Sequence, residues 1–453
     1  MSAKTKSRYV CQQCGASFPK WTGKCENCGA WNSLLEQTAE IEGKSAVAKS
    51  RGKTLFAEKL NDIAADKISS RISTGIADLD LVFGGGLISG GVVLVAGQPG
   101  IGKSTLLLQV AAAVANEQGV LYISGEESVA QVKNRAERLL NIGDKNSKLK
   151  LNLASSTSAD DVAQTIANGG FKLAIVDSMQ TMSMAEIASA PGTVSQITNS
   201  ANIIIRAAKA SNTAVLLVGH VTKDGAIAGP KVLEHLVDVV LSFEGDRYGG
   251  FKLVRAIKNR YGSTAEVAIF DMNERGLEIV KNPSAALLAE RANSDGSVVL
   301  ATMEGNRPLL VEIQALVNPT SFGYAKRASS GFDLNRLTLL IAVLERRTKL
   351  KLADKDIFIN VVGGLKLSDP AADLAVCMAI ASASAERKLR DGAVVFGEVG
   401  LGGEIRSVLA ADKRIAEAKK LGFKFAIAPK SAARSKFVVP AEDLRDALNQ
   451  HLK

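Results

Sequence analysis

Short apolar runs rich in β-branched residues recur along the middle of the chain and alternate with longer, alanine-rich stretches of helical period. Two of the helical stretches cover residues 128–140 and 194–210. Alternation of this kind predicts an α/β domain in which helices cover both faces of a mostly parallel sheet. The predicted strands are residues 92–96, 120–123, 173–176, 214–219, 237–243, 251–257 and 267–270.

The last three predicted strands follow one another without an intervening helix. Short turns can join antiparallel neighbours, whereas parallel neighbours need a long crossover. We therefore expect an antiparallel extension at one edge of the sheet.

The pattern changes after residue 282, where strand and helix signals mix without regular alternation. This change predicts a separate α+β domain over residues 283–453. Upstream of the sheet, residues 41–70 are polar and charged, and we expect a linker with at most one helix, near residues 55–65. The elements expected in the last region are strands at 297–303, 309–316 and 356–362 and helices at 334–344, 371–385 and 413–421.

Composition narrows the class of protein. A chain of 453 residues is long enough for two or three domains. No apolar run approaches the ~20 residues of a membrane span, and residues 1–10 lack the apolar segment of a signal peptide, so we expect a cytoplasmic protein. The net charge of +10 and pI of about 9.2 favour a polyanionic partner without requiring one.

A phosphate-binding loop follows the first strand of the sheet. The segment fits G-x-x-x-x-G-K-[ST] at every fixed position, between a predicted strand at 92–96 and a predicted helix at 105–116. Lys103 is expected on the β- and γ-phosphates of ATP and the Ser104 hydroxyl on Mg²⁺. An accidental glycine-rich turn is the alternative. The residues are Gly97, Gln98, Pro99, Gly100, Ile101, Gly102, Lys103 and Ser104, with Thr105 next.

A second acidic motif ends the strand at 173–176. Asp177 follows four apolar residues, the Walker-B form, and is expected beside Mg²⁺. Because Ser178 follows in place of glutamate, the general base must come from another strand. Glu126 is the candidate and Glu127 the second choice, although either carboxylate could simply begin the helix at residue 128.

His220 ends the strand at 214–219 and is expected at the same edge of the sheet. A neutral imidazole there can sense the γ-phosphate and signal to the loop behind it, residues 221–232, which carries Lys223 and Lys231. The alternative is a histidine with a purely structural hydrogen bond.

A basic block, Lys258-Asn259-Arg260-Tyr261-Gly262, follows the strand at 251–257. Lys258 and Arg260 are two residues apart at a strand end, so their side chains point to the same side and could clamp phosphoryl charge. A basic hairpin tip on the solvated surface is an equal alternative.

Four of the five cysteines lie in the first thirty residues, as two C-x-x-C pairs that are each followed by glycine. This spacing predicts a closed, structural zinc ribbon in a reducing compartment, with the metal supplying the folding energy. Two disulfides or an iron centre are the alternatives. The expected ligands are Cys11, Cys14, Cys25 and Cys28.

Trp21, Trp31 and Lys20 accompany these cysteines. They could form a docking or nucleic-acid surface, or the aromatic rings could only cover the metal.

With these motifs in view, the sequence resembles the RadA (Sms) family of bacterial DNA-repair proteins over essentially its whole length. The matching segments are the four-cysteine motif, GQPGIGKST, YISGEES, LAIVDS, the KNRYG block and the C-terminal region; Tyr261 replaces the phenylalanine found in much of the family. The resemblance implies a RecA-like ATPase in a hexameric ring similar to DnaB-type helicases. It also implies that Lys258 and Arg260 reach a neighbour's ATP, and that loops near 179–196 and 221–232 face DNA. The family is associated with branch migration of recombination intermediates together with RecA.

The C-terminal region resembles the proteolytic domain of Lon, which uses a Ser–Lys dyad. By motif, the serine position falls on Ala371 and the lysine position on Arg414. Alanine has no nucleophile and arginine stays protonated, so we expect no proteolysis. Its basic residues suggest a DNA-binding and ring-forming scaffold, or else a solvated charged face. They are Lys326, Arg327, Arg336, Arg346, Arg347, Lys349 and Lys351.

The sequence thus predicts a multidomain α/β protein with a zinc ribbon (1–40), a linker (41–70), a RecA-like P-loop ATPase (71–282) and an inactive Lon-protease-like domain (283–453). The expected activity is that of a DNA-dependent ATPase and helicase that moves on single-stranded or branched DNA. A non-motor, ATP-switched DNA-binding scaffold is the alternative, and Ala371 and Arg414 disfavour a protease.

Overall fold

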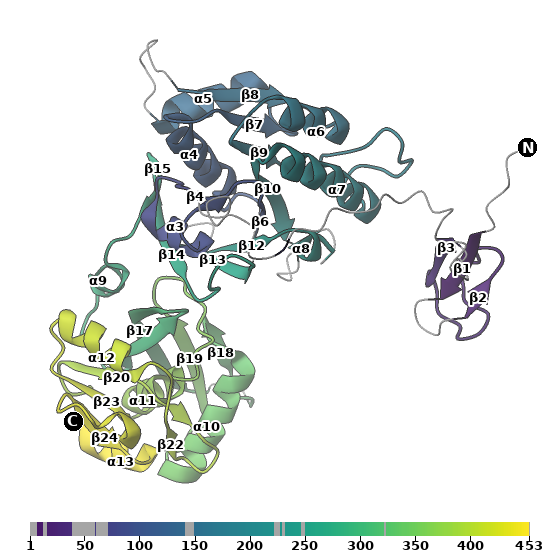
Figure 1. Ribbon diagram of the computed structural model, residues 1–453. Coiled ribbons are helices and arrows are strands. Elements are labelled where there is room, and N and C mark those ends of the chain that lie inside the picture. Colours follow the sequence, from purple (N-terminus) through teal and green to yellow (C-terminus); the bar gives the residue numbers. More distant parts are fainter. Residues whose placement is uncertain are drawn as a thin grey trace, which may run out of the picture. The chain divides into compact units, whose positions relative to one another are not determined.

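The computed structural model describes residues 7–11, 16–38, 59, 71–140, 149–221, 227–228, 232–245, 250–320 and 323–452. The chain divides into two compact units, Met1–Ile68 and Ser69–Lys453 (Figure 1). Apart from Lys59, the expected linker and its helix lie outside the described residues.

The first unit is a small antiparallel sheet of order β2-β1-β3. Cys11, Cys25 and Leu34 are its buried apolar residues, and Tyr9, Ala16 and Phe18 pack against them. So small a core cannot stabilise the unit alone, which fits a domain held by a metal. The strands are β1 (Ser7–Cys11), β2 (Ser17–Phe18) and β3 (Leu34–Thr38).

The second unit begins with a ten-stranded sheet of order β15-β14-β13-β12-β6-β10-β9-β7-β8, with β11 paired to β10. Six neighbouring strands run parallel to one another: β12, β6, β10, β9, β7 and β8. Strands β13, β14 and β15 extend the sheet from β12 as antiparallel neighbours. The predicted parallel sheet and its antiparallel extension are both confirmed. The strands are β6 (Val92–Gly97), β7 (Val120–Ser124), β8 (Leu151–Ser155), β9 (Leu173–Asp177), β10 (Ala214–Val221), β11 (Ile227–Ala228), β12 (Val239–Gly245), β13 (Lys252–Asn259), β14 (Val267–Asn273) and β15 (Gly276–Ile279).

Helices cover both faces of this sheet, as predicted (Figure 1). Val93 and Val95 of β6 share one core with α3, α4 and α5, while Val92 and Leu94 share the opposite core with α6 and α7. Successive strand residues point to opposite faces, so one strand contributes to both cores. The helices are α3 (Ala77–Phe83), α4 (Lys103–Ala115), α5 (Val129–Leu140), α6 (Ala159–Asn168), α7 (Val194–Ser211) and α8 (Val232–Leu236); β4 (Arg71–Ile72) pairs with β5 (Leu87–Ile88).

Strand β8 was not predicted from the sequence. It lies at the edge of the sheet, and its residues LNLAS are half-buried or exposed. An edge strand needs no continuous apolar run, so the signal used for the central strands is missing there.

The C-terminal part has a second sheet of order β18-β19-β17-β16-β20-β23-β24. Helix α11 packs on β16 and β17 and also contacts α10 and α13, which explains why it is buried over most of its length and rich in alanine. The elements are α9 (Pro283–Leu288), β16 (Ser297–Glu304), β17 (Arg307–Pro319), β18 (Arg327–Ser330), α10 (Leu334–Thr348), β19 (Lys355–Val361), α11 (Ala372–Ala385), β20 (Ala393–Val395), β21 (Glu398–Val399), β22 (Ile405–Arg406), α12 (Ala411–Lys420), β23 (Phe425–Pro429), β24 (Val438–Ala441) and α13 (Leu444–His451).

Among the described helices, none is long and apolar enough to cross a membrane.

Candidate active site and metal centre

The glycine-rich motif forms the turn between β6 and α4. Gly100 and Gly102 have φ angles of 77° and 113°, in the region that favours glycine. A Cβ on Gly97 would lie 2.7 Å from the carbonyl oxygen of Phe243, so the neighbouring strand leaves no room for a side chain. Helix α4 has no side-chain N-cap, which leaves its first backbone N–H groups for a phosphate.

Lys103 is buried at the start of α4, with only 4% of its surface exposed. Its Nζ donates to the carbonyl oxygens of Gly97 and Gln98, at 2.8 and 2.9 Å. Burial lowers the pKa of Lys103 to about 8, although the charges of Asp177 and Glu126 act in the opposite direction. A buried ammonium held by carbonyl groups gains strongly from an anionic phosphate, so Lys103 is suited to bind one.

His220 lies at the carboxyl end of β10, in register with Gly97 of β6. Its Nδ1 is 3.3 Å from Lys103 Nζ, and its Nε2 is 3.7 Å from Glu126 Oε1. Burial and then the charge of Lys103 lower the pKa of His220, so the ring is neutral at neutral pH. The imidazole therefore connects the phosphate-binding lysine to the candidate base.

The two candidate bases occupy different environments. Glu126 Oε1 accepts a hydrogen bond from the Ser178 hydroxyl at 2.7 Å and faces His220. Glu127 Oε2 lies 2.7 Å from Arg135 Nη1 of α5, so an ion pair holds it in place. The geometry favours Glu126 over Glu127 as a base.

Asp177 ends β9 and is mostly buried. Its Oδ2 accepts a hydrogen bond of 2.6 Å from the hydroxyl of Tyr122, which in turn accepts one from Arg135 at 3.3 Å. Burial, reinforced by Asp177, raises the pKa of Tyr122 well above its usual value, so Tyr122 stays a donor that orients the carboxylate.

Tyr122 and Arg135 were not predicted as site residues. The available signal was a tyrosine inside an otherwise apolar strand, since a buried tyrosine hydroxyl needs a partner. Which partner it takes depends on the pairing of β7 with β9, where Ser124 lies opposite Asp177.

The residues present fit ATP with Mg²⁺. The Ser104 hydroxyl in the first turn of α4 and the Asp177 carboxylate are hard oxygen ligands of the kind that Mg²⁺ prefers. Thr105 follows in the same turn, and the buried Ile101 anchors the loop in the core.

The basic block lies at the other end of the sheet from the phosphate-binding loop of the same chain. Lys258 Nζ donates to the carbonyl oxygens of Glu234 and Val237, at 2.6 and 2.7 Å, near the end of α8. Arg260 Nη1 lies 3.4 Å from Asp238 Oδ1, and Asp238 Oδ2 accepts from the backbone N–H of Val92, the first residue of β6.

From Val92 to Gly97, the last residue of β6, the strand rises by five residue steps, a distance of about 17 Å at ~3.3 Å per residue. Lys258 and Arg260 therefore cannot contact a nucleotide at their own chain's loop. The rest of the block lies against the end of α3: Asn259 Nδ2 donates to the carbonyl oxygen of Val82 at 3.2 Å, and a Cβ on Gly262 would lie 2.8 Å from Gly84 Cα.

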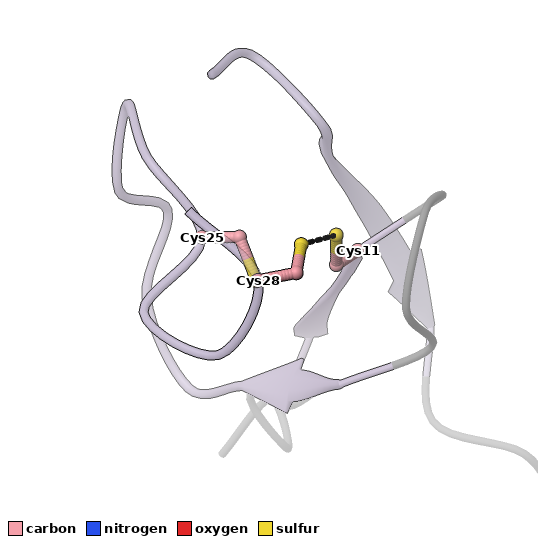
Figure 2. A group of neighbouring side chains, drawn as sticks. All are labelled: Cys11, Cys25 and Cys28. Carbon is pink, nitrogen blue, oxygen red and sulfur yellow. Dashed lines mark hydrogen bonds between the residues drawn. The ribbon is translucent and has the colours of Figure 1, made fainter. Parts of the chain in front are cut away.

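Three of the four predicted zinc ligands meet in the first unit (Figure 2). The sulfur atoms of Cys11, Cys25 and Cys28 all lie within 4.8 Å of one another, and Sγ of Cys11 and Cys28 are 3.6 Å apart. Tetrahedral Zn²⁺ with Zn–S bonds of about 2.3 Å requires sulfurs about 3.8 Å apart, so the thiols fit a zinc site. Cys14 lies outside the described residues.

The C-terminal region has a buried ion pair where Lon would have its dyad. Arg414 is 2% exposed; its Nη1 donates to Asp369 Oδ2 and to the Ala301 carbonyl, both at 2.7 Å. Its Nε donates to the Leu409 carbonyl at 3.1 Å, and Ala371 is fully buried. These contacts give Arg414 a structural role.

Two of the basic residues proposed for a DNA-binding face, Arg336 and Arg327, are half-buried and already bonded within the fold. Arg336 donates from Nε to Asp373 Oδ1 at 3.0 Å, and Arg327 donates to the carbonyl oxygens of Lys355 and Leu352. The charge pattern of the sequence does not reveal these acceptors, and the assignment of both residues to a DNA-binding face stays a prediction. Arg346 and Arg347, in the last turn of α10, are exposed, while Lys223 and Lys231 lie outside the described residues.

Together, the glycine-rich loop, the Lys103–His220–Glu126 cluster and the thiol site define a RecA-like P-loop ATPase that carries a zinc ribbon and takes ATP, Mg²⁺ and Zn²⁺. Three family models match the chain: an AAA domain at residues 60–226, a rubredoxin metal binding domain at 9–36, and subunit ChlI of Mg-chelatase at 337–432. The last lies within the region that resembles Lon.

Relatives match nearly the whole chain. The DNA repair protein RadA of Halalkalibacterium halodurans is 46% identical, covering 94% of this chain and 93% of the relative, and that of Aquifex aeolicus is 46% identical, covering 94% of each. The Pseudomonas aeruginosa protein is 44% identical over 99% of both chains. The chain belongs to the RadA family.

Proposed function

We propose that this chain is a DNA-dependent ATPase that moves along single-stranded DNA in recombinational DNA repair. In this proposal it works in the cytoplasm, processes or branch-migrates recombination intermediates together with RecA, and has helicase activity. Support comes from the relatives, which are named DNA repair proteins, and from the net charge of +10, which favours a polyanionic partner. The observation that carries the proposal is the cluster of Lys103, His220 and Glu126.

For hydrolysis we assign Glu126 as the general base. It would take the proton of the attacking water, and the Ser178 hydroxyl, 2.7 Å from Oε1, would hold the carboxylate in position. Lys103 and the N–H groups of the loop would bind the phosphates, and bound Mg²⁺ would neutralise charge on them. Ser104 and Asp177 are the proposed Mg²⁺ ligands.

His220 would couple this site to DNA. It stands between Lys103 and Glu126, and on its other side β10 pairs with β11 through His220 and Ala228. DNA bound near residues 221–232, with Lys223 and Lys231, could shift this pairing and thereby the imidazole. A second DNA-facing loop, 179–196, is held together by Gln196, whose amide nitrogen donates to the carbonyls of Ile187 and Ser189 at 2.9 and 2.8 Å.

We infer that Lys258 and Arg260 act on a neighbouring subunit's ATP. They lie about 17 Å along β6 from the phosphate-binding loop of their own chain, so we infer that the phosphate they contact belongs to an adjacent subunit. A homo-hexameric ring would supply that subunit. The C-terminal domain, through exposed residues such as Arg346 and Arg347, would add DNA contacts. Its buried Arg414–Asp369 pair and Ala371 argue against a protease.

The test is an ATPase assay with and without single-stranded DNA, paired with a mass measurement of the assembly. We expect stimulation by DNA, a hexamer-sized mass, and strand displacement on forked DNA. A chain that stays monomeric and hydrolyses ATP at the same rate with or without DNA would refute the proposal. Binding of forked DNA without unwinding would instead identify an ATP-switched scaffold.

A matched pair of variants tests the base. Glu126→Gln should lower kcat by about 10²- to 10⁴-fold, the usual contribution of a general base. Glu127→Gln changes the same group one residue away but only weakens the pair with Arg135, so its kcat should fall less than about tenfold. The opposite ranking would assign the base to Glu127.

A further inference from the structure

Two tryptophans of the zinc ribbon lie on its surface. Trp21 is 54% exposed and Trp31 is 72% exposed, whereas Tyr9, Ala16 and Phe18 pack around the buried cysteines. More than half of each indole surface is therefore accessible to a partner, and two large exposed rings on so small a unit point to a binding surface.

The two rings lie beside one another. A Cβ built on Gly23 would be 3.9 Å both from the ring edge of Trp21 and from that of Trp31, so the two edges are no more than about 8 Å apart. Backbone hydrogen bonding fixes this arrangement. The Asn32 N–H donates to the Gly23 carbonyl at 2.8 Å, and the backbones of Lys24 and Trp31 form an isolated antiparallel β-bridge.

Positive charge accompanies the rings. Lys24 Nζ lies 5.6 Å from the centre of the Trp31 ring, and Lys20, next to Trp21, is exposed. Exposed aromatic faces with adjacent cations are the usual elements of a surface on which unpaired bases stack while the cations contact phosphates. Duplex DNA hides its base faces, so such a surface selects single strands.

We propose that Trp21 and Trp31, with Lys20 and Lys24, form a stacking platform for single-stranded nucleic acid. This platform belongs to the first unit and the nucleotide site to the second, and binding to the platform requires no hydrolysis. It therefore goes beyond the proposed function and can fail independently of it.

The chain supplies its own probe, because Trp21 and Trp31 are its only tryptophans. All tryptophan fluorescence thus comes from the ribbon, and stacking of a base on either ring quenches it. The full-length protein would be titrated with an oligothymidylate of about 12 nucleotides and, as a matched control, with an abasic strand of equal length and charge. We expect strong quenching by the first and little by the second.

Variants separate stacking from folding. Trp31→Ala should weaken oligothymidylate binding about tenfold, while Trp31→Phe, which keeps an aromatic face, should retain most of the affinity. Bound zinc per chain, unchanged in both, shows that the ribbon is folded. Lys103→Ala, which removes the ATPase lysine, should leave the quenching intact.

Three results would overturn the proposal. The first is equal quenching by the abasic strand, which would mean charge without stacking. The second is equal affinity of Trp31→Ala and wild type. The third is quenching by added recombinase without any response to oligonucleotide, which would assign the two rings to a protein contact.

Discussion

Two deeply buried cations of the second unit, Lys103 in the nucleotide site and Arg414 in the C-terminal domain, differ in their partners. Lys103 donates to two carbonyl oxygens and faces a neutral imidazole. Arg414 forms an ion pair with Asp369 and donates to two carbonyl groups. A buried cation without a direct counter-ion is suited to bind an anionic ligand, whereas a fully paired one has a structural role.

The pKa values follow this difference. Burial lowers the pKa of Lys103 to about 8. Burial also pushes the pKa of Asp369 upward, but the hydrogen bond and charge of Arg414, together with the backbone N–H groups of Ala371 and Met303, outweigh it, and the pKa lies below its ordinary value. A bound phosphate would therefore supply Lys103 with a counter-charge, whereas Asp369 already neutralises the charge of Arg414.

The largest expected effect is that of Lys103→Ala. Removing the phosphate-binding ammonium should lower ATP hydrolysis by about 10³-fold or more, because no other described cation contacts the loop. The thermal midpoint should fall less than that of Arg414→Ala, since Lys103 has no carboxylate in direct contact that its removal would leave unpaired. A stable Lys103→Ala variant with wild-type turnover would show that Lys103 is not the phosphate-binding cation.

Arg414→Ala should act on stability. It leaves the Asp369 carboxylate buried without its cation, which costs about 3–5 kcal/mol of unfolding free energy, measured by denaturant titration. Arg406→Ala is the matched control, because Arg406 forms only an exposed pair with Glu404 and should cost less than about 1 kcal/mol. Equal costs for the two variants would contradict a structural role for Arg414.

Lys258 and Arg260 extend the comparison to partly exposed cations. Lys258→Ala or Arg260→Ala should lower DNA-stimulated hydrolysis about 10- to 100-fold while bound zinc stays unchanged. Mixing Arg260→Ala with Lys103→Ala chains should restore activity above the sum of the two, because each supplies what the other lacks. Full unwinding by either single variant, or no rescue on mixing, would count against action in trans.

The smallest effect is the dependence of ATP binding on pH. Lys103 keeps its proton below pH 8 and loses it above, so ATP affinity should be constant below pH 8 and weaken above it by up to about tenfold per pH unit. Lys103→Arg keeps its charge and should bind with a flat profile over the same range. Calorimetry from pH 7 to 9.5 would compare them; parallel profiles would show that Lys103 does not titrate there.

Sequence patterns were sufficient for most elements of the sheet. The central strands, buried on both faces, are continuous apolar runs, and the helices on them repeat with helical period. Asp177 and His220 could be placed at one edge because the carboxyl ends of parallel strands lie together. Edge elements such as β8 and β15 lacked this signal.

The sequence by itself determined the phosphate-binding loop, the thiol pairs and the strand ends that carry Asp177, Glu126 and His220, because each depends on neighbours in the chain. Only the tertiary structure decided which groups share a contact. It paired Glu127 with Arg135, Tyr122 with Asp177 and Arg336 with Asp373. It also placed Lys258 and Arg260 at the end of β6 opposite the phosphate-binding loop. Such pairings depend on strand order and register, which bring together side chains that no local pattern connects.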